Sequence, residues 1–355
     1  MNLLSTTQLL EKLISFESLS TKEKEIADWL ESYSSLLNDV SVSRIGDNIL
    51  IRLQGKQNTE LLFNTHLDVV PASPNHAYAA FEPFINDGKV FGRGSTDAKG
   101  SLAAMFSALC EFTASGYTSK HSLLFAFTVC EESYGDFNGA LELKKGGYFD
   151  NVIAGVVGEP TSLAPCIAQK GILLIDIILK GESGHAARIP VSENLLYKLP
   201  DCLERLKQVD MKKINPLIGP VKLTPTRIVG GTANNMAPEE IRITVDIRTI
   251  PEVSSQEIIS SVQQALPEAE IVVRSDRFKA VSTDAEHRIA KVCEKLSNKP
   301  VFGSPTCSDW AFLGEIPIVK MGPGHSEQSH TANESIEIEQ LEKGKELYLK
   351  LMQQF

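Results

Sequence analysis

The sequence lacks the features that would place it among nucleic-acid-binding, membrane-spanning or disulfide-rich proteins. Basic residues are in the minority, 35 against 45 acidic ones, so the formal net charge is -10 and the pI about 5.3. Such a surface repels nucleic acid and anionic lipid, and we expect neither as a partner. No apolar run approaches the length of a membrane span. The six cysteines form no C-x-x-C pair and are expected to be free, reduced thiols.

Other absences concern targeting and common catalytic motifs. Residues 1–21 have no basic leading region and no small-residue cleavage site, so we expect a cytoplasmic protein. Their Leu and Ile spacing predicts an amphipathic helix, with Ser5 and Gln8 forming a capping box. There is no P-loop and no H-E-x-x-H pair. In "GRGSTD", Asp97 stands where a dinucleotide-binding loop has its third glycine.

What is present is the balance of a soluble globular chain of one large or two smaller domains, with 42% hydrophobic residues. The first half alternates strand and helix patterns. Apolar runs at 61–63, 122–130 and 151–157 predict buried strands. The segment after Asp97 predicts a helix, with Asp97 as its N-cap and Gly116 as its stop. This alternation predicts an α/β fold with a mostly parallel sheet.

The middle of the chain has a different pattern. Strict alternation over 240–249 predicts a half-buried strand. The expected order is strand, helix, strand, strand, helix, strand, a split ferredoxin-like arrangement, over 171–181, 192–209, 220–229, 240–249, 254–266 and 268–275. We therefore predict an inserted α+β domain at 169–277 within a domain formed by 1–168 and 278–355.

Several predicted strands are followed at their C-terminal ends by residues that bind metals or protons. His66 and Asp68 follow the first strand, Glu131 and Glu132 the second, and Glu159 the third. In open α/β sheets, ligands bind at the edge formed by the C-terminal ends of the strands. The remaining candidates are Asp97 and, after a strand pattern at 316–322, His325 and His330.

Imidazoles and carboxylates gathered at one edge would repel or titrate unless positive charge lay among them. Nitrogen and oxygen ligands suit zinc, manganese or cobalt, and more than four ligands suggest two ions with a bridging carboxylate. Asp68 is placed to fix the tautomer of His66. Of the adjacent Glu131 and Glu132, one can bind metal while the other serves as general base.

The motifs "HLDVVP", "GRGSTDAKG", "EESYG", "GEPT", "GHAA" and "HTANE" together resemble the ordered motif series of the M20 metallopeptidase family. Within it, "GESGHAARIP", "GSPTCSDWAFL" and "KMGPGHSEQSHTANE" are most similar to the acetylornithine deacetylase group. The resemblance covers essentially the whole chain. It implies a zinc-binding catalytic domain with an inserted ferredoxin-like dimerisation domain, and hence a homodimer.

The resemblance also implies roles for individual residues. One metal would be held by His66 and Glu159, the other by Glu132 and His330, with Asp97 as the bridge. Further residues have family roles as general base (Glu131), orienter of His66 (Asp68), oxyanion stabiliser reaching the partner subunit's site (His185), and binders of the substrate carbonyl and carboxylate (Asn235 and Arg248).

The expected reaction is hydrolysis of an N-acyl amino acid by metal-activated water. N2-acetylornithine is the first candidate, giving ornithine and acetate for arginine biosynthesis, with two zinc ions, or cobalt or manganese, as cofactors. Acetylcitrulline, succinylornithine, succinyl-diaminopimelate and dipeptides remain alternatives. The desuccinylase alternative is weakened because the typical "RGS" stretch reads "QKG" here. Asp309 is a candidate partner for ornithine's cationic side chain.

Simpler explanations compete at several positions. Asp97 can be no more than a helix cap, His185 a surface residue, and Arg248 half of a salt bridge with a neighbour. His325 is the rival of His330 as a ligand. A non-enzymatic binding or assembly protein is the alternative at the level of function, but such a protein has no use for Glu131 beside a metal ligand.

Overall fold

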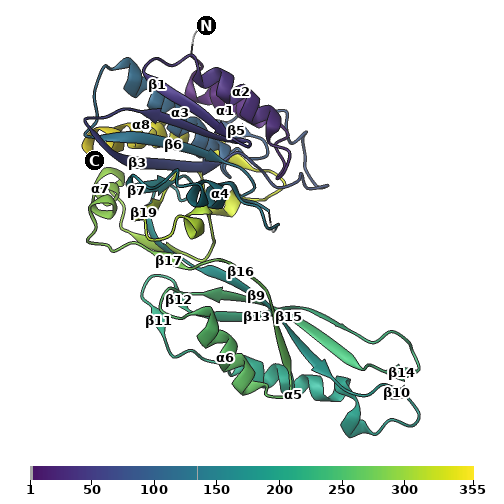
Figure 1. Cartoon of the computed structure of the whole chain (residues 1–355). Coiled ribbons are helices and arrows are strands. Elements are labelled where there is room, and N and C mark those ends of the chain that lie inside the picture. The colour runs from purple at the N-terminus through teal and green to yellow at the C-terminus, as the bar shows by residue number, and fades with distance from the viewer. Residues whose placement is uncertain (1–2, 134) are drawn as a thin grey trace. The chain divides into compact units, whose positions relative to one another are not determined.

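The computed structural model describes residues 3–133 and 135–355, and the chain divides into two compact units. Unit 1 comprises Met1–Ile167, Ser282–Phe302 and Ser308–Phe355. Unit 2 comprises Ala168–Val281 and Gly303–Cys307. The chain therefore leaves unit 1 after Ile167, forms most of unit 2 and returns to unit 1 at Ser282 (Figure 1). It enters unit 2 a second time with the short segment Gly303–Cys307.

The larger sheet has nine strands in the order β1-β2-β6-β3-β7-β19-β8-β17, with β18 beside β8. Its centre is parallel, since β3 pairs in parallel with β6 and β7, and β7 with β19. This confirms the predicted α/β class. The strands are β1 (Val40–Ile45), β2 (Asn48–Leu53), β3 (Gln57–His66), β6 (His121–Thr128), β7 (Val152–Val157), β8 (Cys166–Gln169), β17 (Val281–Ser282), β18 (Phe302–Ser304) and β19 (Ile318–Lys320).

Apolar side chains explain why the central strands are buried on both faces. Leu61 and Phe63 of β3 and Phe125 of β6 belong to one large core, and the rings of Phe63 and Phe125 stack at 4.9 Å. Helices that contribute to this core are α1 (Thr6–Ile14), α2 (Lys24–Ser34), α3 (Lys99–Ala114), α7 (Arg288–Ser297) and α8 (Ile338–Gln354). The short helix α4 (Gly139–Lys145) packs against β6 and the 3-10 helix η2 (Asp309–Phe312).

Local sequence signals fix several element ends. The capping box of Ser5 and Gln8 is present at the start of α1, as predicted. A small three-stranded sheet is formed by β4 (Phe84–Asn86), β5 (Lys89–Phe91) and β20 (Ser335–Glu337). The six cysteines are free thiols.

Unit 2 has the predicted ferredoxin-like order. Its four-stranded antiparallel sheet is ordered β13-β15-β9-β16 and carries two helices. Ile241, Ile243, Val245 and Ile247 of β15 are fully buried in a second core, as the alternating pattern predicts. The elements are β9 (Gly171–Lys180), α5 (Leu195–Lys207), β13 (Lys222–Gly230), β15 (Glu240–Thr249), α6 (Ser255–Ala265) and β16 (Glu270–Phe278).

Four two-residue strands and two 3-10 helices complete the assignment. The strand pairs of unit 2 are β10 (Gly184–His185) with β14 (Met236–Ala237), and β11 (Ile214–Asn215) with β12 (Gly219–Pro220). The 3-10 helices are η1 (Val191–Glu193) and η3 (Ser326–Gln328).

Candidate metal centre

The parallel strands of unit 1 release polar side chains at one edge of the sheet. His66 is the last residue of β3. Glu131 and Glu132 follow β6, and Glu159 follows β7, the two parallel neighbours of β3. Because parallel strands end on the same side, these four residues come together as the sequence predicts.

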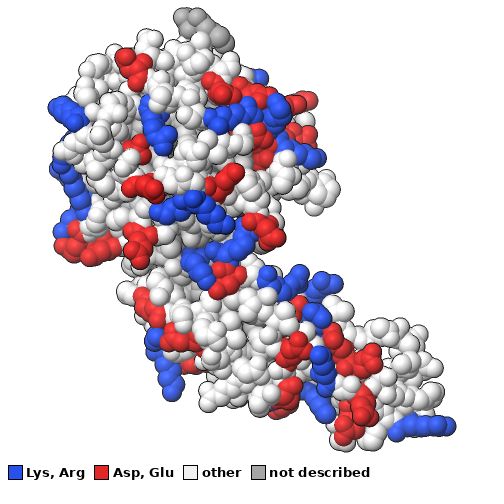
Figure 2. Space-filling view, viewed as in Figure 1, with Lys and Arg blue, Asp and Glu red and all other residues white. Residues whose placement is uncertain are grey.

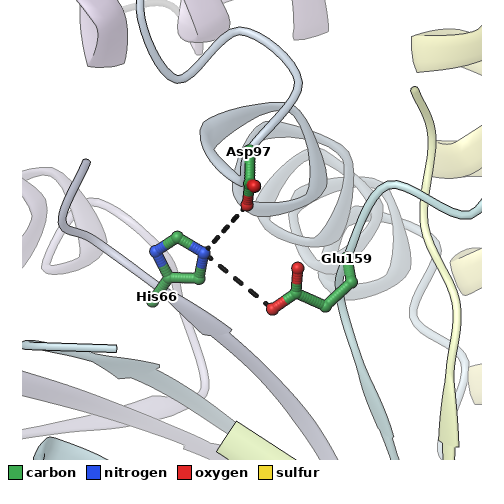
Figure 3. A group of neighbouring side chains, drawn as sticks. All are labelled: His66, Asp97 and Glu159. Atoms are coloured by element: carbon green, nitrogen blue, oxygen red, sulfur yellow. Dashed lines mark hydrogen bonds and ion pairs between the residues drawn. The ribbon is translucent and has the colours of Figure 1, made fainter. Parts of the chain in front are cut away.

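Asp97 completes a first group with His66 and Glu159. His66 Nε2 lies 3.3 Å from Asp97 Oδ1 and 3.9 Å from Glu159 Oε1 (Figure 3). The imidazole is only 1% exposed, so its ring is held in place by the surrounding protein. The three side chains converge on one point from two strand ends and the segment before α3 (Figure 3).

A second group forms on the other side of Asp97. His330 Nε2 lies 2.8 Å from Glu132 Oε1 and 3.5 Å from Asp97 Oδ2. One oxygen of Asp97 therefore faces His66 and the other faces His330. This is the arrangement that a carboxylate needs to bridge two cations.

The donor chemistry of both groups fits divalent metal ions. One ligand atom from each of His66, Asp97 and Glu159 lies within 4.8 Å of the others, and the same holds for Asp97, Glu132 and His330. Imidazole nitrogen and carboxylate oxygen suit zinc and other divalent first-row metals. Carboxylates outnumber imidazoles here, so the site has an excess of negative charge for cations to neutralise.

The electrostatics of the cluster support the same conclusion. Burial, reinforced by neighbouring carboxylates, raises the pKa of Glu159 to about 8. Burial raises the pKa of Glu131 well above its ordinary value. The hydrogen bond with Glu132 raises the pKa of His330 to about 9. Raised pKa values of buried acids, beside an imidazole whose pKa is also raised, indicate an excess of negative charge that cations would neutralise.

Asp68 contacts more of the site than the sequence suggests. His66 Nδ1 lies 2.9 Å from the backbone carbonyl oxygen of Asp68 and 3.6 Å from its carboxylate oxygen Oδ1. The carboxylate accepts the backbone N–H groups of Glu131 and Glu132, each at 3.0 Å, and the hydroxyl of Ser20 at 2.7 Å. Asp68 thus orients the imidazole and also holds the backbone of both glutamates.

Two buried carboxylates near the site are missed by sequence reasoning. Glu23, 2% exposed, accepts the backbone N–H of Cys130 at 2.9 Å. Glu334 accepts the backbone N–H groups of Gly94, Thr96 and Asp97. Acceptors of backbone amides leave no mark on the side-chain pattern. The one available signal is the place of Glu334 as the last residue of "HTANE".

The structure contradicts one prediction about an individual aspartate and gives the surroundings of a second. Asp97 is not the N-cap of α3: that position is Ala98, without a side-chain cap, and the Asp97 carboxylate faces the site instead. Asp309 is 1% exposed, and its oxygens accept hydrogen bonds from Thr128 Oγ1 at 2.5 Å and Asn138 Nδ2 at 2.8 Å. Asp309 is therefore a buried acceptor of hydrogen bonds from the protein, and its role as the partner of a substrate amine stays a prediction.

The residues predicted to contact the substrate or its oxyanion, His185, Asn235 and Arg248, belong to unit 2. His185 of β10 pairs with Met236 of β14, and the Ala186 N–H donates to the Asn235 carbonyl at 2.9 Å, so His185 and Asn235 are neighbours. Arg248, in β15, donates from Nε to Asp246 Oδ1 at 2.9 Å, the salt bridge expected as its alternative. His325, the rival ligand, contacts Ser162 Oγ at 2.8 Å rather than either metal group.

Comparison with known proteins decides the family. The model of "Peptidase family M20/M25/M40" matches residues 62–354. The chain belongs to this family. Among curated relatives, [LysW]-lysine/[LysW]-ornithine hydrolase of Sulfurisphaera tokodaii is 29% identical over 343 residues, covering 94% of this chain and 91% of the relative. Succinyl-diaminopimelate desuccinylase of Wolbachia pipientis wMel is 26% identical over 377 residues, covering 98% and 92%.

Two solved structures share the fold. Aminopeptidase PepT from Bacillus cereus superposes with a TM-score of 0.80 at 20% identity, covering 98% of this chain and 97% of that one. The YXEP protein from Bacillus subtilis, a dinuclear metal-binding peptidase of family M20, has a TM-score of 0.74 at 14% identity, covering 99% and 98%.

This M20 chain is a metal-dependent hydrolase of amide bonds. Its cofactors are divalent metal ions, for which the two groups around Asp97 are the candidate site. Among the residues that the structure describes, no helix is both long and apolar enough to span a bilayer. Acidic and basic side chains lie interspersed over the face of the molecule shown in Figure 2.

Proposed function

We propose that this M20 enzyme removes the acyl group from the amino nitrogen of an amino acid, with N2-acetylornithine as the first candidate substrate. The observation that carries the hydrolytic part is the placement of Asp97, whose two oxygens face His66 and His330 at 3.3 and 3.5 Å. Water would add to the acyl carbonyl, and the carbon–nitrogen bond would break to give a carboxylate and a free amine.

In the proposed site, His66 and Glu159 hold one ion, Glu132 and His330 the other, and Asp97 both. Zinc is the proposed metal, with cobalt and manganese as alternatives of similar ligand preference. Two such ions, when bound, supply Lewis acidity that acidifies water and polarises the acyl carbonyl.

Glu131 is the proposed general base. Its backbone N–H is held by Asp68, and burial raises the pKa of its carboxylate. A carboxylate with a raised pKa accepts a proton from the attacking water more readily than an ordinary one. The same group then returns that proton to the departing nitrogen. Asp68 supports this step by fixing both His66 and the Glu131 backbone.

Residues of unit 2 complete the proposal. His185 would stabilise the oxyanion in the partner subunit's site, Asn235 would bind the substrate carbonyl, and Arg248 the substrate carboxylate. Residues 169–277 would then serve as a dimerisation and lid domain in a cytoplasmic homodimer, with catalysis in 1–168 and 278–355. Exposed apolar side chains of this unit, including Val191 and Tyr197, both 67% exposed, support an association surface.

The chemistry shared by the relatives' names supports the substrate class. Lysine, ornithine and diaminopimelate each carry two amino groups, and the named reactions release one of these compounds. Ornithine belongs to this set. A desuccinylase is the second candidate because several relatives bear that name at 26–27% identity.

Parallel assays test the substrate. We expect the zinc-loaded enzyme to show its highest kcat/KM on N2-acetylornithine, compared with N-acetylcitrulline, N-succinylornithine, N-succinyl-diaminopimelate and a dipeptide. A kcat/KM at least about tenfold higher on a succinylated substrate, a difference of about 1.4 kcal/mol in transition-state binding, would replace the proposal by the desuccinylase alternative.

A further inference from the structure

Glu334 is a fully buried carboxylate, and the steps of the proposed reaction assign no role to it. Its carboxylate receives four hydrogen bonds: from Arg93 Nη1 at 2.6 Å, and from the backbone N–H groups of Gly94, Thr96 and Asp97 at 2.9 Å each. Glu334 and Arg93 are 0% and 1% exposed. Such a buried ion pair is costly to form, and four donors on one carboxylate point to a specific task.

The contacts are divided evenly between the two carboxylate oxygens. Oε2 accepts from Arg93 and Gly94, whereas Oε1 accepts from Thr96 and Asp97. Each oxygen therefore faces two donors. Only an ionised carboxylate accepts hydrogen bonds at both of its oxygens without offering a donor. An amide side chain in this place would turn its NH2 group toward two of the N–H donors.

The backbone of Glu334 is fixed as well. Its carbonyl accepts hydrogen bonds from the Tyr78 hydroxyl at 2.8 Å and from the Gly92 N–H at 3.1 Å. Next to it, Thr96 Oγ1 donates to the Ser335 carbonyl at 2.8 Å. The segment 92–97 is thus wrapped around Glu334 and ends at Asp97.

This arrangement joins two metal-ligand segments. Glu334 lies four positions after His330 in the chain, and it holds the backbone N–H of Asp97. Asp97 in turn faces His66 with one oxygen and His330 with the other. A rotation of the Asp97 backbone would take one of these oxygens away from its group.

We propose that Glu334, charged and paired with Arg93, is a positioning residue that sets Asp97 to bridge two ions. The inference rests on the proposed two-ion function. Glu334 touches neither the ions nor the substrate: it acts through the Asp97 backbone. Outer partners of metal ligands typically contribute about 10- to 100-fold in metal affinity.

The test is Glu334→Gln, which keeps the shape of the side chain and removes its charge. Zinc is titrated calorimetrically into metal-free protein, and the unfolding temperature of the metal-free protein is measured in parallel. We expect two ions per wild-type chain, and in the variant at least about a tenfold weaker affinity for one ion or both. Glu327→Gln is the matched control because it removes the same charge from an exposed position of η3, seven residues before Glu334, and should bind zinc as the wild type does.

Arg93→Gln is the second variant, and it keeps the test decisive if Glu334→Gln does not fold. It leaves the Glu334 carboxylate and its three backbone donors in place but removes the cation, so we expect a smaller loss of zinc affinity. Unchanged zinc affinity in the folded variants, with only a lower unfolding temperature, would show a purely structural role and overturn the inference. Wild-type protein that binds fewer than two ions would instead overturn the two-ion function itself.

Discussion

Asp68 Oδ1 accepts a hydrogen bond from the backbone N–H of Glu131 at 3.0 Å. This bond joins the segment that follows β3 to the proposed general base, which follows β6. Asp68 Oδ2 accepts the next backbone N–H in the same way. An Asp68→Asn variant keeps one acceptor and turns an NH2 group toward the other amide. A buried unpaired donor costs about 1–3 kcal/mol.

We therefore expect Asp68→Asn to unfold at a lower temperature and to lose about 10- to 100-fold in kcat/KM. Thermal unfolding and steady-state kinetics on the zinc-loaded protein measure both effects. Ser20→Ala is a milder control, since it removes only the hydroxyl donor to Asp68. Wild-type kinetics in Asp68→Asn would show that the carboxylate does not position Glu131.

Glu131 and Glu132 are adjacent but have different proposed roles, so the same substitution should separate them. Glu131→Gln should bind two ions and lose about 10²- to 10⁴-fold in kcat, the usual contribution of a general base. Glu132→Gln should lose affinity for one ion, because Glu132 and His330 are the proposed ligands of that ion. Their Oε1 and Nε2 atoms lie 2.8 Å apart. Elemental analysis of the bound metal and measurement of kcat for each variant test the two roles. Turnover by Glu131→Gln within about tenfold of wild type would exclude it as the base.

Metal removal should weaken the fold as well as stop the reaction. Without cations, buried carboxylates such as Glu159 and Glu132 repel one another. Chelated protein should be inactive and unfold at a lower temperature. Zinc at about 100 times its dissociation constant should restore about 2.7 kcal/mol of stability. An unfolding temperature that zinc does not change would mean that the residues around Asp97 do not bind zinc.

His185 gives a test of the dimer. His185→Ala should bind two ions normally but lose about 10²- to 10³-fold in kcat, as removal of an oxyanion donor does. A mixture of the His185→Ala and Glu131→Gln proteins, after subunit exchange, should recover about a quarter of wild-type activity. Random pairing makes half of the dimers mixed, and each mixed dimer has one intact site out of two. Absence of recovery in a mixture shown by light scattering to be dimeric would place His185 outside the partner's site.

The sequence predicts those features of the molecule that depend on side-chain pattern. Alternation at 240–249 gives the buried face of β15, and the apolar runs before His66 and Glu159 give parallel strands whose ends must meet. Two-residue strands such as Gly184–His185 depend on backbone pairing with distant residues, which no local pattern reveals.

The contacts that orient the site were beyond sequence reasoning for the same physical reason. Glu23 binds the backbone of Cys130, 107 positions away, and Glu334 that of Asp97, 237 positions away. Every non-proline residue has a backbone N–H, so the identity of the donor leaves no trace. Asp309 shows the same limit from the acceptor's side, because the sequence does not reveal that its carboxylate accepts hydrogen bonds from Thr128 and Asn138.

The central claim is that Asp97 bridges two ions, and anomalous diffraction from crystals grown with zinc tests it most directly. The account predicts two anomalous peaks, one contacting His66 and Glu159 and the other Glu132 and His330, with one Asp97 oxygen on each. A single peak, or two peaks of which either lacks Asp97, would contradict it.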